Sequence, residues 1–387
     1  MKNVLLVFGG MSYEHDISVV TASQIYNKTK IDDVKLVPFY VSRENRFYVY
    51  LSEKFILSDF TITGFNLAKK RFKEIAFVSN EKGILFSKTK FGLKEYLKSD
   101  TAIFAMHGSD GENGKLQAIF ESFGIYSSCG NFDSLAICMN KYLFKQVMLG
   151  IKVPTVSGFK LTQNDLNENA DKIKEKVNRL GFPLVVKSNN GGSSIGLFVA
   201  SNEEEFFEKL KESFEFDNEI LVEKFIEGSR EFNVAVIGDN DKFSVSEIDE
   251  PLKTHEILSF ADKYCSDASG KAVKIDKSLK NSMAGSLRKF PADIPVRLQN
   301  RMKKFASRIF KALNLRGIVR IDFLYNEKDN KIYVCEVNAI PGSLAFYFFT
   351  KNQILINDFV KKLISIAEKY KETHFLINKE YITDVLK

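Results

Sequence analysis

The sequence has only four cysteines among its 387 residues and no tryptophan. The cysteines are Cys129, Cys138, Cys265 and Cys335. They form no Cys-x-x-Cys pair and no metal-ligand spacing, which fits a reducing compartment, so we expect a cytoplasmic protein. The apolar run from Val4 to Phe8 is too short for a signal peptide, and no run approaches the length of a membrane span. We therefore expect no membrane partner.

The usual marks of nucleic-acid binding and two common nucleotide-binding motifs are also missing. Neither a Walker A loop nor a dinucleotide fingerprint occurs. The net charge of +7 comes from 56 basic and 49 acidic residues scattered along the chain, with no block of Lys and Arg interleaved with aromatic residues. Nucleic acid is therefore not an expected partner.

The composition is that of an ordinary globular protein, and the length suffices for two or three domains. Hydrophobic patterning predicts an N-terminal α/β domain with a mostly parallel sheet, a small central α+β domain and a C-terminal α+β domain. We expect strands at 4–8, 35–40, 101–106, 181–187, 196–200, 219–225 and 231–237, and helices at 18–28, 133–150, 202–214, 295–313 and 352–372. Residues 45–95 favour several short strands.

A hairpin near the C-terminus gathers polar side chains on one face. Residues 318–325 and 331–338 alternate with period two and flank an all-polar connector. If Tyr325 and Lys331 close the loop, Arg320 lies opposite Glu336 and Asp322 lies opposite Val334. The polar face then holds Arg320, Asp322, Glu336 and Asn338, and the apolar face holds Ile321, Phe323, Tyr333, Cys335 and Val337. This face is either a magnesium site beside a phosphate or oxyanion clamp, or a solvated sheet surface.

The Gly/Ser-rich loop from Lys187 to Gly196 lies between two expected strands rather than between a strand and a helix. Its glycines let successive amides turn inward, and its serine hydroxyls add donors, so the loop can wrap phosphate oxygens beside Lys187. The alternative is a flexible hairpin turn.

Two further segments carry candidate binding residues. Glu223-Lys224-Phe225-Ile226 ends a strand beside a hinge, so Glu223 and the local backbone suit an adenine edge and Glu231 suits ribose hydroxyls. A surface salt-bridge pair is the alternative explanation. His107 begins a glycine-rich loop at the carboxyl end of the strand 101–106, where α/β domains place ligands. No second His or Cys stands at ligand spacing, so we expect a hydrogen-bonded, structure-organising histidine.

Taken in order, these segments resemble the D-alanine–D-alanine ligase family of the ATP-grasp superfamily. The stretch from Val7 to Ser18 is similar to the opening motif of that family, and His107 to Gly114 is similar to its H-G-x-x-G-E-x-G motif. Arg320-Ile321-Asp322 with Glu336-Val337-Asn338-Ala339-Ile340-Pro341-Gly342 is similar to the third motif. The resemblance runs from about residue 4 to 349. It implies three domains: an N-terminal substrate-binding domain at 1–139, a central ATP-grasp subdomain at 140–222, and a C-terminal ATP-grasp subdomain with the metal site at 223–387.

The resemblance also implies a role for each matching residue. Glu14 would bind the ammonium of the first D-alanine, oriented by Ser193 and Tyr264. Arg320 with the Gly342 amide would stabilise the oxyanion, and Arg320 would also lie near the carboxylate of the second substrate. Asp322, Glu336 and Asn338 would hold two magnesium ions, or manganese in their place. The nucleotide contacts would come from Lys141, Lys187, Ser194, Glu223, Lys224, Ile226, Glu231 and Lys263.

The activity that the resemblance implies is the ATP-dependent joining of two D-alanines through an acyl phosphate, for peptidoglycan precursors, in a homodimer. The rivals are a ligase that joins D-alanine to D-lactate or D-serine, and a non-catalytic ATP-binding regulator. Tyr264 after Lys263 favours the dipeptide, and the full set of metal and phosphate residues argues against the regulator. Three departures from the family pattern are Ser188, the run from Ser343 to Tyr347, and a long segment at 265–290. Tyr347 stands where a serine often helps to bind the second carboxylate.

Overall fold

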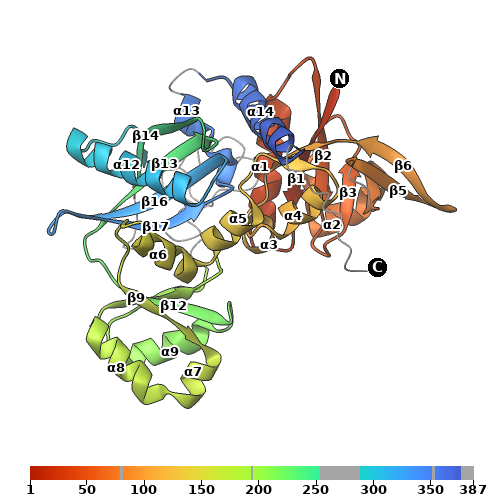
Figure 1. The fold of residues 1–387 in the computed structure, drawn as a ribbon. Helices are drawn as coiled ribbons and strands as arrows, with labels where there is room; N and C mark the ends of the chain where they lie inside the picture. The colour runs from red at the N-terminus through yellow and green to blue at the C-terminus, as the bar shows by residue number, and fades with distance from the viewer. Residues whose placement is uncertain (79–81, 193–194, 253–287, 351–353, 376–387) are drawn as a thin grey trace, which may run out of the picture.

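The computed structural model describes residues 1–78, 82–192, 195–252, 288–350 and 354–375. In this part of the chain three β-sheets follow one another along the sequence (Figure 1). The first and third sheets share one hydrophobic core, whereas the middle sheet has a core of its own. Among the described helices, none is long and apolar enough to cross a membrane.

The N-terminal sheet has eight strands in the order β6-β5-β4-β3-β2-β1-β7-β8. They are β1 (Lys2–Gly9), β2 (Val34–Val41), β3 (Phe47–Tyr50), β4 (Phe72–Phe77), β5 (Ile84–Thr89), β6 (Gly92–Lys98), β7 (Thr101–Phe104) and β8 (Tyr126–Ser127). The group β2-β1-β7-β8 is parallel, and β3 to β6 extend it as an antiparallel meander. The α/β fold class is therefore confirmed, and the short strands expected between 45 and 95 form the antiparallel extension. This extension makes the sheet mixed rather than mostly parallel.

The inner strand β1 explains the position of the first binding loops. It is buried from Val4 to Gly9, as expected for a parallel strand covered on both faces. The helices of this region are α1 (His15–Lys28), α2 (Ile62–Leu67), α3 (Ser109–Glu112) and α4 (Lys115–Ser122), with 3₁₀ turns η1 (Leu57–Phe60) and η2 (Lys69–Arg71). The loops that follow β1 and β7 leave the same edge of the sheet, because the two strands are parallel neighbours.

The central sheet is antiparallel, in the order β11-β10-β12-β9. Its strands are β9 (Gly158–Thr162), β10 (Leu184–Ser188), β11 (Leu197–Ala200) and β12 (Glu219–Lys224), with helices α7 (Gln163–Glu168), α8 (Ala170–Leu180) and α9 (Glu203–Ser213). Ile173 and Val177, one helical turn apart on α8, are buried in its core. The Gly/Ser-rich loop joins β10 to β11, as the sequence predicts.

The C-terminal sheet is also antiparallel, in the order β15-β14-β13-β16-β17. Its strands are β13 (Arg230–Gly238), β14 (Phe243–Pro251), β15 (Arg288–Lys289), β16 (Gly317–Asn326) and β17 (Lys331–Asn338). The accompanying helices are α12 (Val296–Ala312), α13 (Tyr347–Thr350) and α14 (Ile356–Phe375), with the 3₁₀ turn η3 (Gly342–Ala345). The helix expected at 295–313 is confirmed as α12, and the tail helix is confirmed as α14.

The last helix, α14, joins the first and third sheets. It packs against β7 and β8 of the N-terminal sheet and against β13 and β16 of the C-terminal sheet. Lys371 pairs with Asp100 at 2.5 Å, and Lys369 pairs with Asp239 at 2.9 Å. Phe359, Val360, Leu363 and Ile366 of this helix are buried in the core that the two sheets share.

The single helix expected at 133–150 is wrong, because the chain breaks at Asn140. The structure has α5 (Phe132–Met139) and α6 (Lys141–Gly150), and Asn140 between them is extended. The Asn140 side chain caps α6 by accepting a hydrogen bond from the Leu143 amide at 2.9 Å. The break places Lys141 in the first turn of a new helix.

Candidate active site

A narrow cavity of about 40 Å³ lies where the three sheets meet. Its walls come from the loops after β1 and β7, from α6 and the loop after β10, and from β16, β17 and the turn that follows them. Seven residues singled out by the sequence line it: Glu14, His107, Lys141, Arg320, Glu336, Asn338 and Gly342. Residues more than three hundred positions apart therefore share one site.

Glu14 lies at the contact between the N-terminal and central regions. It is 7% exposed, and its amide donates to Ser12 Oγ at 3.1 Å. A Cβ at Gly108 would come within 2.7 Å of Glu14 Oε2, and a Cβ at Gly192 within 2.9 Å. Because both neighbouring positions are glycine, two loops can close directly on the carboxylate.

His107 ties the N-terminal region to the C-terminal region. Its Nδ1 lies 2.9 Å from the Ile340 carbonyl oxygen, and its Nε2 lies 2.8 Å from Thr21 Oγ1. The Ser343 amide donates to the same Thr21 hydroxyl at 3.2 Å. Both ring nitrogens thus make hydrogen bonds, and the prediction of a structure-organising histidine is confirmed.

Glu112 is a half-buried acid to which the sequence assigned no role. Its Oε1 accepts a hydrogen bond from the Gly108 amide at 3.3 Å and lies 3.5 Å from His107 Nδ1. Burial raises the pKa of Glu112, and the charge of Glu14 raises it further, whereas His107 lowers it. The sequence feature that could have identified Glu112 is its place in the same glycine-rich motif as His107.

Glu223 is held by two lysines. Lys145 pairs with its Oε1, and Lys187 Nζ lies 2.5 Å from its Oε2. Burial alone would raise the pKa of Glu223, but Lys187 and Lys145 lower it to about 2. Burial lowers the pKa of Lys187, yet Glu223 outweighs it and the net shift is upward. The alternative of a surface salt bridge is wrong here, because all three side chains are largely buried.

Sequence analysis missed Lys145, although it stands four residues after Lys141 on the same face of α6. Lys141 Nζ donates to the Gly191 carbonyl oxygen. Burial lowers the pKa of Lys141, while the nearby Glu336 raises it. Its ammonium therefore lies between the loop after β10 and the carboxylates of the hairpin.

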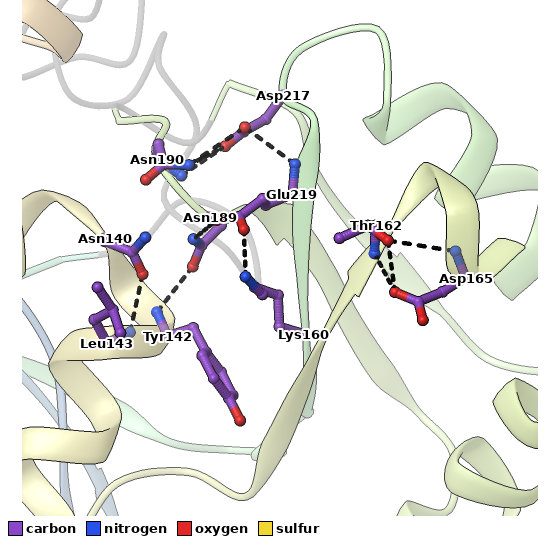
Figure 2. A network of polar contacts seen from close by, with 10 residues as sticks. All are labelled: Asn140, Tyr142, Leu143, Lys160, Thr162, Asp165, Asn189, Asn190, Asp217 and Glu219. Atoms are coloured by element: carbon purple, nitrogen blue, oxygen red, sulfur yellow. Dashed lines mark hydrogen bonds and ion pairs between the residues drawn. The ribbon is translucent and has the colours of Figure 1, made fainter.

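The start of that loop is anchored to α6 (Figure 2). Asn189 accepts through its backbone oxygen from the Lys141 amide at 3.0 Å, and through Oδ1 from the Tyr142 amide at 2.8 Å. Its Nδ2 donates to Glu219 Oε2 at 2.8 Å, and the Asn190 amide donates to Asp217 Oδ2 at 2.6 Å. These bonds align the helix that carries the lysines with the phosphate-binding candidate loop.

The other nucleotide candidates lie along β12 and β13. Lys224 donates to the carbonyl oxygens of Gly181 and Phe182, at 3.0 and 2.7 Å, so its side chain points away from the face of Glu223. Ile226 is half-buried just beyond β12, and its carbonyl oxygen accepts from the Ser229 amide at 3.3 Å. Glu231, half-buried on β13, is close enough to Cys335 to raise the pKa of that thiol.

The register expected for the hairpin is wrong. Asn326 rather than Tyr325 pairs with Lys331, and a bulge follows, so that Arg320 lies opposite Asn338 and Asp322 lies opposite Glu336. The bulge brings two carboxylates directly across from each other on neighbouring strands.

Cys335 is the extra residue of the bulge, and its expected place on the apolar face is also wrong. Tyr333 lies opposite Leu324, on the same face as Asp322, so its expected place on the apolar face is wrong as well. Burial raises the pKa of its thiol, and the charges of Lys187 and Glu223 are the next largest influences on that pKa. Cys335 therefore borders the cluster around Glu223. The side chains buried beside it on β17 are Ile332, Val334 and Val337.

Arg320 and Asp322 form a two-pronged ion pair. Nε donates to Oδ1 and Nη2 to Oδ2, both at 2.8 Å. Asn338 Nδ2 adds a bond to Oδ2 at 2.9 Å, and Asn233, with its amide nitrogen turned toward Asp322, donates to Oδ1 at 3.0 Å. Arg320 and Asp322 are both buried, so a solvated sheet face is excluded for this pair.

The oxygen atoms of Asp322, Glu336 and Asn338 fit a magnesium site. Carboxylate and amide oxygens are the hard donors that this ion prefers. Within the described residues no group of three His, Cys, Asp or Glu side chains is arranged for a metal. In a magnesium site the third protein oxygen would come from the Asn338 amide. Asp322 would then exchange its contacts with Arg320 for the cation.

Four predicted residues, Ser193, Ser194, Lys263 and Tyr264, lie outside the described residues. The same holds for most of the segment at 265–290.

The described turn after β17 has an unexpected backbone, because Ser343, Leu344 and Ala345 all have positive φ. Ser343 Oγ donates to Gln24 Oε1 at 2.9 Å, which fastens this turn to α1.

Two family models match the chain: D-ala D-ala ligase N-terminus over residues 3–129, and D-ala D-ala ligase C-terminus over residues 147–365. The D-alanine--D-alanine ligase of Thermosipho melanesiensis is 35% identical over 377 residues, which cover 96% of this chain and 95% of that protein. The sequence likeness therefore extends over nearly the whole chain.

Solved structures are similar over the same span. The VanG D-Ala:D-Ser ligase from Enterococcus faecalis has a TM-score of 0.77 at 23% identity, covering 95% of this chain and 99% of that one. The D-alanine--D-alanine ligase from Bacillus anthracis complexed with ATP has a TM-score of 0.67 at 22% identity, covering 97% of this chain and 100% of that one. At such identities the structural likeness shows only that the fold is shared.

Proposed function

The chain belongs to the D-alanine–D-alanine ligase family, and we propose that its three-sheet cavity joins two D-alanines to D-alanyl-D-alanine at the expense of ATP. The observation that carries this proposal is the meeting of Glu14, Lys141, Arg320 and Glu336 around one cavity. One bound substrate can therefore reach four different groups. They are, in the same order, an acceptor for an ammonium, a cation for phosphate, a clamp for an oxyanion and a carboxylate suited to a metal. The product serves peptidoglycan precursor synthesis.

In the first step the carboxylate of one D-alanine attacks the γ-phosphate of ATP and forms an acyl phosphate and ADP. Glu14 holds the ammonium of that D-alanine, because its buried carboxylate is the negative group beside the two closing glycines. Lys141 and Lys187 neutralise phosphate charge, as phosphoryl transfer requires. Ser193 and Tyr264 would orient Glu14, and Lys263 and Ser194 would cover the phosphates.

Asp322, Glu336 and Asn338 would hold two magnesium ions, or manganese, which neutralise charge on the phosphates. The adenosine is proposed to lie along β12 and β13, where Glu223, the backbone near Ile226 and Glu231 supply acceptors and donors. Lys224 would contribute through its backbone, since its side chain is bonded to the loop before β10. Glu223 then positions Lys145 and Lys187 as well.

In the second step the amine of another D-alanine, after losing a proton, attacks the acyl carbon and phosphate leaves. Arg320 and the Gly342 amide stabilise the oxyanion, because both groups line the cavity. Water has to be excluded, since the acyl phosphate would otherwise hydrolyse. The narrow cavity and the glycine contacts with Glu14 serve that exclusion.

The test is incubation of the protein with ATP, magnesium and D-alanine, alone and with D-lactate or D-serine, followed by mass spectrometry. We expect D-alanyl-D-alanine as the main product in every mixture. A dominant mixed product would replace this proposal by one of the rival ligases, and a lack of any D-alanyl product would end it. We further propose a cytoplasmic homodimer, which light scattering and cell fractionation measure.

A further inference from the structure

Arg288 is fixed between a buried carboxylate and an aromatic ring. Its Nη1 donates to Asp249 Oδ2 at 3.1 Å, and its guanidinium carbon lies 4.5 Å from the centroid of the Tyr347 ring. A guanidinium over a ring face is attracted by the ring quadrupole and is restricted in orientation. Two contacts from different elements, β14 and α13, therefore orient one cation.

Asp249 belongs to the same face of the C-terminal sheet as the proposed metal residues. Asn233 lies opposite Asp249 on one side and opposite Asp322 on the other, and Asp322 lies opposite Glu336. Directly opposed residues point to the same face, so the four side chains form a row across four strands. With strands about 4.8 Å apart, Asp249 lies roughly 10 Å from Asp322.

The charges around Asp249 link Arg288 to the proposed oxyanion clamp. Burial raises the pKa of Asp249 to about 6, whereas Arg288 and Arg320 both lower it. The two guanidinium groups therefore share one carboxylate as a neighbour. Arg320 lies beside Asp322 within the row, and Arg288 lies beside Asp249 at its outer end.

The two side chains of the Arg288–Asp249 pair differ in their exposure to solvent. The Asp249 side chain is 1% exposed and the Arg288 side chain is 12% exposed, so the arginine keeps some accessible surface whereas the carboxylate has almost none. A planar guanidinium matches a carboxylate through two parallel hydrogen bonds. Arg288 opposes Pro251, two positions beyond Asp249, and so shares its face, whereas its neighbour Lys289 opposes Glu250 and points to the other face.

We propose that Arg288 binds the carboxylate of the second D-alanine, with Asp249 and Tyr347 as the residues that hold its guanidinium in place. The inference rests on the proposed function and names the receptor for its second substrate. The first D-alanine occupies Glu14 and the phosphates occupy the lysines, so the second D-alanine approaches from the β14–β15 side. Its amine then faces the acyl carbon beside Arg320 while its carboxylate meets Arg288.

The experiment compares Arg288→Gln, Arg288→Lys and the matched control Lys289→Gln with the wild type. Steady-state rates give separate KM values for the two D-alanines, and positional isotope exchange in labelled ATP reports the first step alone. We expect Arg288→Gln to raise the second KM about tenfold or more, since a charged hydrogen bond is lost. The first KM and the exchange rate stay within twofold. Arg288→Lys recovers part of the loss, and Lys289→Gln changes neither KM.

Two results would overturn the assignment. One is a second KM within twofold of wild type in Arg288→Gln, and the other is an equal loss in both KM values and in isotope exchange, which marks a structural role. Wild-type protein that makes no dipeptide would instead overturn the proposed function, and the inference with it. Thermal melting of each variant checks that the chain is folded.

The positioning role of Asp249 is tested by substituting it in the wild type and in the Arg288→Gln variant. Asp249→Asn should raise the second KM severalfold in the wild type and add nothing in the Arg288→Gln background, because its effect passes through the guanidinium. Additive effects of the two substitutions would contradict a positioning role.

Discussion

Glu223 binds two lysines at once, Lys145 at Oε1 and Lys187 at Oε2. The two lysines come from α6 and β10, so one carboxylate connects a helix before the central sheet to a strand within it. Such a buried group of charges costs desolvation, which its mutual attraction offsets only if all members are present. The cluster therefore keeps Lys187 charged and in place beside the phosphate-binding candidate loop.

The pKa of Glu223 predicts a specific pH dependence of stability. The folded value is about 2 and the reference value is 4.5, so the carboxylate stabilises the fold above pH 4.5 and loses this contribution as the pH falls toward 2. The shift corresponds to a contribution on the order of 3 kcal/mol. Glu223→Gln should lower the free energy of unfolding at pH 7 and flatten its decline below pH 4.5, as measured by denaturant titration.

The control for this prediction is Glu204→Gln, at an exposed position of α9. It should leave the pH profile of wild type unchanged. A wild-type slope in Glu223→Gln would show that the lysines do not act through this carboxylate.

The contact between Gly192 and Glu14 predicts a defect in the first substrate site. A Cβ at residue 192 would lie 2.9 Å from Glu14 Oε2, so Gly192→Ala should push the carboxylate aside. Because the obstructed atom ends a flexible side chain, we expect little loss of stability and a KM for the first D-alanine raised about tenfold, as for a charged hydrogen bond. Gly150→Ala is the control, since a Cβ there meets nothing within 4 Å. Equal KM values in the two variants would contradict the role of Glu14.

Removal of a proposed metal carboxylate should abolish most turnover in a folded chain. Glu336→Ala and Asp322→Ala each remove an oxygen donor, and we expect kcat to fall about a hundredfold or more, because loss of several kcal/mol of charge stabilisation has that effect. Asp322→Ala should also lower the melting temperature, since Arg320 loses its two-pronged partner. Asp329→Ala, in the exposed hairpin turn, is the control. Near-normal rates in both variants would refute the metal assignment.

Hydrophobic periodicity and the order of the motifs predicted most of this architecture. The prediction failed where a local irregularity or a contact between distant residues decides the structure. The alternation of residues 331–338 does not reveal that Cys335 forms a bulge, because one extra residue leaves the apolar composition unchanged. The hydrophobic pattern of a helix likewise continues through Asn140 without interruption. The break is marked only by the Asn140 side chain, which accepts a hydrogen bond from the Leu143 amide and so caps a new helix.

Prediction of the site residues from the sequence failed in the same way. Glu14, Lys141, Arg320, Glu336, Asn338 and Gly342 were identified from sequence and line one cavity. Lys145 was missed, because its partner Glu223 lies 78 residues away and no local pattern joins them. Arg288 was missed for the same reason, since the ion pair with Asp249 and the ring of Tyr347 depend on strand pairing and on a turn with left-handed residues.

The stoichiometry of a single reaction tests the central claim most directly. Wild-type protein is supplied with ATP, magnesium and D-alanine, and ADP, phosphate and dipeptide are quantified in the same sample. We expect one ADP and one phosphate for each D-alanyl-D-alanine, and no ADP release above background without D-alanine. ADP release that D-alanine does not stimulate, or ADP formed without dipeptide, would contradict it.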